Sequence, residues 1–254
     1  KPGQPLGLEG VSLLPGPLKR SPVAGSYAKM AVGIDQALEQ TPFISTTVSK
    51  LVEMFGVKTG RGSVVPQKQQ ALIADFLADI GVGFEPDQRF GNVPLKLDGR
   101  LCLFKDDKAT EEAVDEEYLS ARLKMETGIL AAAADGEVNQ REVLEIKRFI
   151  PELERLRKCH KDRLTALARS LMKKIVGEKQ VFAAINRLEG SAFDQIVDMV
   201  VNVFLVDGDL NPREVSFLER LYKATKRPLA DCHARLHRNG SIFAEGEDAV
   251  LVQP

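Results

Sequence analysis

The strongest constraint on the fold of this chain is an internal repeat of an apolar helix, a short acidic loop and an amphipathic helix. The first copy spans residues 128–143 and the second spans residues 200–215 of the 254-residue sequence. Both copies share the order Asp-Gly, an acidic residue, an apolar residue, Asn, two further residues and Glu-Val. Two similar helix-loop-helix units predict a pseudo-twofold pair in a mainly α-helical domain.

Helix capping explains about half of the positions in the repeated loop. The glycine stands where a helix ends in a left-handed residue. The asparagine suits the N-cap of the next helix, and the glutamate three residues later can accept a hydrogen bond from the N-cap amide. A proline fits the first helical position, where its missing N–H costs nothing. The positions explained in this way are Gly136, Asn139 and Glu142, followed by Gly208, Asn211, Pro212 and Glu214.

Capping does not explain the aspartate before the glycine or the acidic residue after it. An aspartate at the C-terminal end of a helix faces the negative end of the helix dipole, at a cost of about 0.3–1 kcal/mol. Its repetition favours a compensating cation. An EF-hand is excluded, because its earlier ligand positions fall on Ala131 and Ala133 in one copy and on Val203 and Leu205 in the other.

Two interpretations of the acidic loops remain. In the first, carboxylates from one or both loops supply oxygen ligands to a hard divalent cation. Ca²⁺ or Mg²⁺ is then preferred to Zn²⁺, because the motif contains no thiol and no imidazole. In the second, the loops only cap helices and carry solvated charge, and no metal binds.

The doubled motif resembles the TerB domain of tellurite-resistance proteins, an all-α fold built as two related halves. The resemblance covers about residues 113–238. Residues 83–91 and the sequence after them resemble the region before TerB in multidomain bacterial proteins that also carry a TerB-N module. Such proteins belong to bacterial stress and phage-defence systems and act in complexes with other proteins, without a known catalytic reaction.

The resemblance also implies a set of metal ligands, since the acidic loop residues of TerB domains are proposed to bind metal. Carried onto this chain, the ligands are Asp135, Glu137 and Glu142 with Asp207, Asp209 and Glu214.

The pattern of prolines, glycines and apolar residues divides the chain into four segments. We expect an extended Pro/Gly-rich linker over 1–26, a smaller helical region over 27–110, a TerB-like helical bundle over 111–239 and a flexible tail over 240–254. Residues 95–104 alternate apolar and polar side chains around an Asp-Gly pair, which accepts the positive φ angles of a type I′ turn. This pattern predicts a β-hairpin.

One stretch, Lys147–Lys174, is strongly basic, although the net charge of −1 excludes a uniformly basic binder of polyanions. From the helical period we expect its cations to lie mainly on the solvent side, with Arg163, Arg169, Lys173 and Lys174 as candidate partner-binding residues. The stretch is then either a solvated helix face or a docking surface for an acidic protein, an anionic lipid surface or nucleic acid.

Three cysteines, Cys102, Cys159 and Cys232, form an odd and widely spaced set without a signal-like segment, which favours the cytoplasm. No apolar run approaches the roughly 20 residues that cross a bilayer, so membrane association would require partners. His233 and His237 lie beside Cys232 at a spacing that can chelate zinc. A structural zinc site needs four ligands, so an ordinary amphipathic helix is favoured.

Catalytic motifs are not found: the sequence has no nucleophile elbow, no P-loop and no H-E-x-x-H. Glu85-Pro86-Asp87 holds two carboxylates in a turn-like context, where structural hydrogen bonding by Asp87 or Arg89 is favoured over acid–base chemistry. Together with the acidic loops, the TerB resemblance implies a non-catalytic, Ca²⁺-like metal-binding interaction module of a bacterial stress-response system, of tellurite-resistance or phage-defence type. The alternative is a metal-free scaffold that docks an acidic partner or nucleic acid through 147–174.

Overall fold

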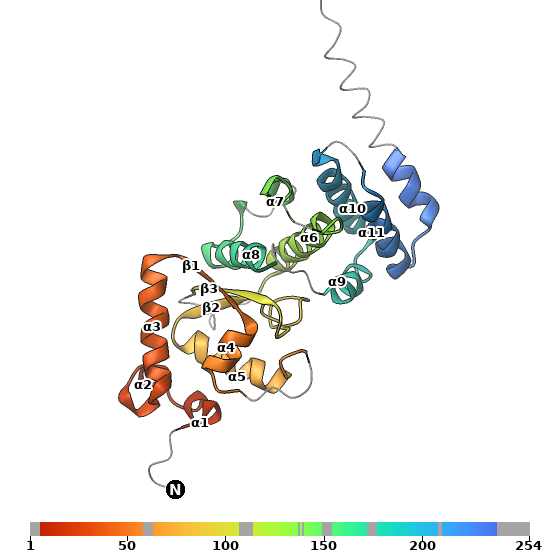
Figure 1. Cartoon of the computed structure of the whole chain (residues 1–254). Coiled ribbons are helices and arrows are strands. Elements are labelled where there is room, and N and C mark those ends of the chain that lie inside the picture. Colours follow the sequence, from red (N-terminus) through yellow and green to blue (C-terminus); the bar gives the residue numbers. More distant parts are fainter. Residues whose placement is uncertain are drawn as a thin grey trace, which may run out of the picture. The chain divides into compact units, whose positions relative to one another are not determined.

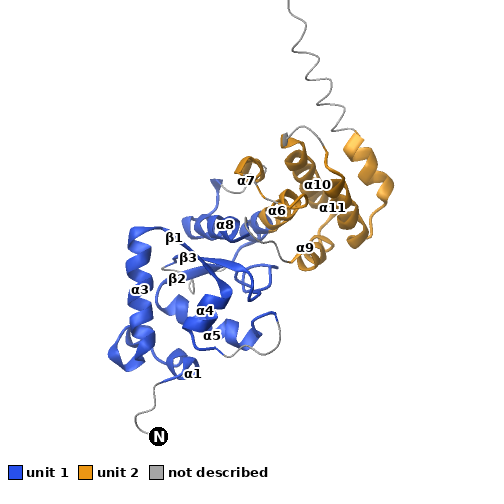
Figure 2. Cartoon of the chain, in the orientation of Figure 1, with its two compact units in different colours: residues 1–122, 152–176 blue, residues 123–151, 177–254 orange. Residues whose placement is uncertain are grey.

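The computed structural model describes most of the chain, and its residues divide into two compact units. The described residues are 6–57, 63–106, 114–136, 138, 140–148, 154–171, 177–207 and 210–237. Unit 1 comprises residues 1–122 and 152–176, and unit 2 comprises residues 123–151 and 177–254 (Figure 2). The mainly helical fold class is confirmed, with one small sheet (Figure 1). The expected domain boundary lies between residues 110 and 111. The observed division instead falls within helix α6 (Glu116–Ala132), and residues 152–176 belong to unit 1.

Unit 1 surrounds a three-stranded sheet with helices. Its elements are α1 (Leu8–Ser12), α2 (Gly16–Lys19), the 3-10 helix η1 (Pro22–Ala24), α3 (Ser26–Gln40), β1 (Phe43–Thr47), α4 (Val48–Met54), α5 (Gln67–Asp79), β2 (Val82–Glu85), β3 (Arg100–Lys105), the first turns of α6, and α8 (Lys158–Leu171).

The segment expected to be an extended linker is not extended where the structure describes it, from residue 6 onward. It forms three short helical segments, and Leu8 and Val11 lie buried in the core of unit 1. The prolines do not prevent this, because Pro17 and Pro22 stand in the first turn of their helices, where no N–H donor is needed.

Strand β3 is the centre of the sheet and pairs antiparallel with β1 on one side and β2 on the other. Its side chains alternate between two cores. Leu101 and Leu103 join the core formed with α3, α4 and α5, whereas Cys102 and Phe104 contact Ala166 of α8. The sheet is therefore covered by helices on both faces (Figure 1).

The hairpin expected over 95–104 is replaced by different pairings. Only its second arm becomes a strand, β3, whose run of consecutive apolar residues suits a strand that is buried on both faces. The first arm bonds elsewhere: Val65 N donates to Leu95 O at 3.0 Å and Leu97 N to Ser63 O at 2.8 Å. Neither Asp98 nor Gly99 has a positive φ, so the connection is not a type I′ turn.

Unit 2 is built from helices that pack around aromatic side chains. Its elements are the remainder of α6, α7 (Gln140–Arg148), α9 (Glu178–Ile185), α10 (Gly190–Phe204), the 3-10 helix η3 (Leu205–Asp207), α11 (Pro212–Ala224) and a helix over 229–237. Phe217 of α11 contacts the rings of Phe182 and Phe204 edge-on, with centroids 5.5 and 6.1 Å away. None of the helices in the described ranges has the length and apolar character that crossing a membrane requires.

Two helical glycines provide a matched test of this packing. A Cβ added at Gly33 of α3 would meet nothing within 4 Å, whereas one at Gly128 of α6 would lie 2.7 Å from the buried Ile146 of α7. We expect Gly33→Ala to raise the free energy of unfolding by about 0.5–1 kcal/mol through helix propensity. Gly128→Ala gains the same propensity but overpacks a stiff side chain at a cost of about 1–3 kcal/mol, so stability should fall. Urea unfolding measures both, and equal gains would contradict the described α6–α7 contact.

Candidate functional site

The first acidic loop follows α6 closely. The helix ends at Ala132, and Gly136 has a φ of +131°, which confirms the expected positive φ at this glycine. The carboxylates of the loop differ in exposure: Asp135 is exposed, whereas Glu142 in the first turn of α7 is buried. Glu137 and Asn139 lie outside the described residues.

The second acidic loop begins after η3 and ends at α11. Asn211 is the N-cap of α11, and its side-chain oxygen accepts a hydrogen bond from Arg213 N at 2.9 Å. Glu214 Oε2 accepts from Asn211 N at 2.7 Å, which completes the predicted capping box, and Pro212 stands in the first turn. Gly208 and Asp209 lie outside the described residues, and of Asp207 only the backbone is described, as the last residue of η3.

The first loop meets the start of α11 through an arginine of the repeat. Arg213 Nη1 donates a hydrogen bond to the backbone carbonyl of Asp135 at 2.8 Å. Asp135 stands three residues beyond the end of α6, so this hydrogen bond places a cation in the loop next to an acidic residue. Arg213 therefore supplies part of the compensating positive charge that the repeated aspartates favour.

The six predicted metal ligands are only partly placed by the structure. Asp135, Glu142 and Glu214 are described, whereas Glu137, Asp209 and the side chain of Asp207 are not. Within the described part of the chain, no three side chains of His, Cys, Asp or Glu gather so that they could hold a metal ion. The described donors alone therefore do not form a metal site.

The zinc alternative finds no support in the geometry of the last helix. Cys232 is fully buried, and burial raises the pKa of its thiol to about 11, which disfavours the thiolate that a metal needs. His233 contacts Glu219 instead, with 3.0 Å between Nε2 and Oε1.

The exposure expected for Arg163 is wrong. Its side chain is only 4% exposed, because α8 packs this face onto the sheet and places the guanidinium between two carboxylates. Arg163 Nη1 donates to Glu85 Oε1 at 3.1 Å, and Nη2 donates to Asp106 Oδ2 at 2.6 Å. Arg169 of the same helix is exposed, as expected, and stacks on the ring of Phe43 at 4.6 Å. Lys173 and Lys174 lie outside the described residues.

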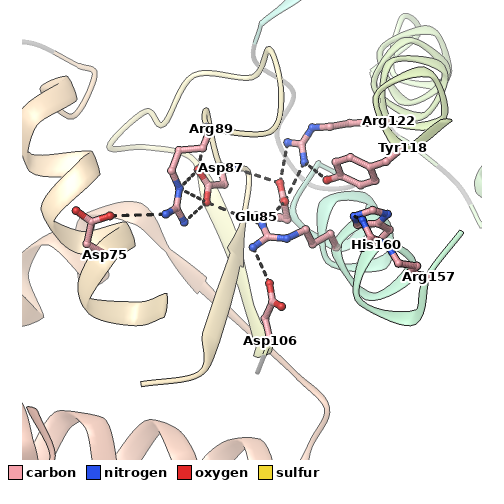
Figure 3. Close-up of polar contacts among 10 residues, drawn as sticks. Asp75, Glu85, Asp87, Arg89, Asp106, Tyr118, Arg122, Arg157 and His160 are labelled. Carbon is pink, nitrogen blue, oxygen red and sulfur yellow. Dashed lines mark hydrogen bonds and ion pairs between the residues drawn. The ribbon is translucent and has the colours of Figure 1, made fainter. Parts of the chain in front are cut away.

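Arg163 belongs to a buried charged cluster around Glu85, the last residue of β2. Figure 3 shows Glu85 with Arg122, Asp87 and Asp106 near it. Glu85 is inaccessible to solvent and accepts two hydrogen bonds from Arg122 of α6, at 2.9 and 2.7 Å. Arg122 also donates to the hydroxyl of Tyr118 at 2.8 Å, and burial raises the pKa of Tyr118 to about 12. The Glu85 cluster thus joins residues of β2, α6 and α8 with the buried Asp106.

Asp87 extends the Glu85 cluster toward the surface. Its backbone N–H donates to Glu85 Oε2 at 3.0 Å, and its carboxylate accepts several hydrogen bonds from Arg89, the shortest at 2.7 Å. This geometry agrees with the structural hydrogen-bonding role favoured for Asp87 and Arg89. The ring of Phe90 lies 3.9 Å from the guanidinium carbon of Arg163, so an aromatic face replaces water around this cation.

Two related helix-loop-helix halves, joined by the hydrogen bond from Arg213 of α11 to the first acidic loop, define a helical module of the kind that the repeat predicts. Residues 125–235 match the family described as "Tellurite resistance protein TerB". This match confirms the resemblance to TerB that was drawn from the doubled motif, over residues 125–235. The match indicates a module of tellurite-resistance type. No match was found among curated proteins or among solved structures.

Substitutions of two arginines of α8, one inside and one outside the Glu85 cluster, test how much the cluster stabilises the fold. We expect Arg163→Met to lower the free energy of unfolding by about 3–5 kcal/mol, because it leaves the buried carboxylates of Glu85 and Asp106 short of a cation. Arg169→Met removes the same charge from the same helix but only an exposed stacking contact, so it should cost about 0.5–1 kcal/mol. Urea unfolding followed by circular dichroism measures both values. Similar losses for the two variants would contradict the role of Arg163.

Substitutions of Arg213 test the hydrogen bond that it donates to the first acidic loop. Arg213→Ala removes the donor to the Asp135 carbonyl and should lower the free energy of unfolding by about 0.5–1.5 kcal/mol. Arg213→Lys keeps the charge near the end of α6 and should lose less. Lys223→Ala, an exposed cation on the same helix, is the control for removal of charge from α11. If Arg213→Ala and Lys223→Ala have the same stability, the contact does not join the halves.

Proposed function

We propose that this chain is a non-catalytic interaction module of a bacterial stress-response system, of tellurite-resistance or phage-defence type, whose paired acidic loops bind a divalent cation. The TerB match supports the first part of this proposal, because it covers both helix-loop-helix units. The partners would be other proteins of the same complex, and the cation would be Ca²⁺ or Mg²⁺.

The observation that carries the cation proposal is the hydrogen bond from Arg213 to the Asp135 carbonyl, because it brings the first loop to the start of α11. Residues of both copies can then contribute to one acidic surface. The described donors are oxygens only, which suits a hard cation. Glu137, Asp207 and Asp209 stand at the remaining acidic positions of the same two loops and would complete the donor set.

Glu214 is not fully available as a ligand of the proposed cation. One oxygen of its carboxylate already accepts the N-cap hydrogen bond of α11. Asp135 is exposed and keeps its side chain at the surface of the first loop. A cation held by both loops would bind only the folded domain, so it would stabilise the fold by mass action, by about 2.7 kcal/mol at a hundredfold excess over its Kd.

The melting temperature of the full chain tests the cation proposal. We expect Ca²⁺ to raise the melting temperature and a chelator to reverse the increase. Asp135→Asn combined with Asp207→Asn should abolish the response. Glu116→Gln combined with Glu117→Gln removes two exposed carboxylates from the start of α6 and should keep it. The proposal fails if Ca²⁺, Mg²⁺ and Mn²⁺ all leave the melting temperature unchanged and chelation has no effect.

The alternative function, docking through the basic stretch 147–174, gains no such support. Arg163, one of its four candidate residues, is enclosed by Glu85 and Asp106 and is not available at the surface. Arg169 is the described member of the set that remains exposed. Arg155, Arg157 and Lys158 of the same stretch are also exposed, but Arg157 lies 3.6 Å from Asp115 and Lys158 lies 2.6 Å from Asp162.

A further inference from the structure

A pocket of about 280 Å³ lies in unit 2, at the C-terminal end of α11. Its lining includes Phe193 and Asp194 from the start of α10, Tyr222 from α11, Arg227 from the turn that follows, and Asp231 and Arg235 from the helix 229–237. Its volume is near the lower limit of known small-molecule sites, so a ligand would have to be small. None of these residues belongs to the acidic loops or to the Glu85 cluster.

The turn after α11 holds the backbone of Arg227 in a fixed position. Arg227 N donates to Tyr222 O at 2.9 Å and Lys226 N donates to Lys223 O at 3.1 Å, the two hydrogen bonds of a Schellman motif. Lys226 has a φ of +55°, in the left-handed region that this motif requires. The guanidinium of Arg227 stacks on the ring of Phe193, with its carbon 3.9 Å from the ring centroid. Arg227 is therefore positioned before any ligand binds.

Apart from the ring of Phe193, the guanidinium of Arg227 has no hydrogen-bond or ion-pair partner within the part of the chain that the structure describes. Its Nε is buried and makes no hydrogen bond. Arg235, the second arginine of the pocket, differs, because it lies 3.1 Å from Asp194 Oδ1 and 3.6 Å from Asp198 Oδ1. The Nη groups of Arg227 make no hydrogen bond among the described residues either, and Arg227 lines the pocket, so a carboxylate in the pocket could accept hydrogen bonds from them.

The remaining charges of the pocket define the ligand further. Arg235 neutralises Asp194, which leaves Arg227 as the cation and Asp231 as the anion of the lining. Among the described residues, no hydrogen bond or ion pair is made by the carboxylate of Asp231. With two arginines and two aspartates the lining has no net positive charge, which disfavours a doubly charged anion such as phosphate. A ligand that carries one carboxylate and one ammonium group would match both unpaired charges.

We propose that this pocket binds a small zwitterion of the α-amino acid class, with Arg227 holding its carboxylate and Asp231 holding its ammonium group. The ring of Phe193 keeps the guanidinium in place, and the hydroxyphenyl group of Tyr222 lines the wall of the pocket. The site is independent of the proposed cation site and requires no metal.

Isothermal titration calorimetry of the full chain with the twenty common amino acids tests this proposal. At least one amino acid should bind saturably, and its carboxylate-only and amine-only analogues should bind at least tenfold more weakly. Arg227→Gln should weaken the amino acid at least tenfold. Arg187→Gln removes an exposed arginine outside the pocket and should leave the affinity unchanged. Asp231→Asn should weaken the amino acid but not the carboxylate-only analogue.

Three results would overturn the proposal: no saturable binding of any amino acid, unchanged affinity in Arg227→Gln, or tighter binding of inorganic phosphate than of every amino acid. Circular dichroism checks that Arg227→Gln is folded. If it is not, Arg227→Lys keeps the charge but loses the paired donors, and it should still weaken the amino acid at least tenfold. Unchanged affinity in both Arg227→Lys and Asp231→Asn would then reject the site.

Discussion

The buried carboxylate of Glu85 determines how the secondary structure of unit 1 fits together. It accepts hydrogen bonds from two guanidinium groups, Arg122 of α6 and Arg163 of α8, and all three side chains are almost inaccessible to water. Charges in such a place are costly unless they are paired with good geometry, so the helices must meet the end of β2 in one register. This requirement accounts for the position of α8, which lies within the TerB match but packs on the sheet of unit 1.

The features that could be predicted from the sequence are those decided by neighbouring residues. The capping box of Asn211 and Glu214, the proline in the first turn of α11 and the positive φ of Gly136 each depend on a few consecutive positions. The burial of Arg163 depends instead on Glu85 and Asp106, which are distant in sequence. Its neighbour Leu164 lies on the apolar side of α8, so helical periodicity places Arg163 at the border of that side. Glu85 ends the buried strand β2, and Asp106 directly follows β3. Acidic residues next to such apolar segments were the available signal that buried cations were needed.

The strand pairing of the sheet is a second feature that depends on residues distant in sequence and could not be predicted. Alternation around Asp98 and Gly99 suggested that the nearest apolar segments would pair, because a short turn is the simplest connection between antiparallel strands. The structure pairs β3 with β1 and β2, so each partner is separated from it by a longer stretch of chain. A sequence pattern indicates which side chains share a face of a strand, but it does not identify the neighbouring strand. Packing of α8 on one face and of α3 to α5 on the other decides that choice.

The contact between Arg213 and the carbonyl of Asp135 has a consequence for the order in which the domain becomes stable. Donor and acceptor are 78 residues apart, so the loop after α6 obtains this partner only after α11 has formed and docked. In solenoid repeats each unit interacts only with its sequence neighbours, and stability adds up unit by unit. Here a side chain of the second helix-loop-helix unit donates a hydrogen bond to the loop of the first, so the first unit lacks this bond when it is alone. During synthesis, the first half therefore lacks this hydrogen bond until Arg213 has left the ribosome.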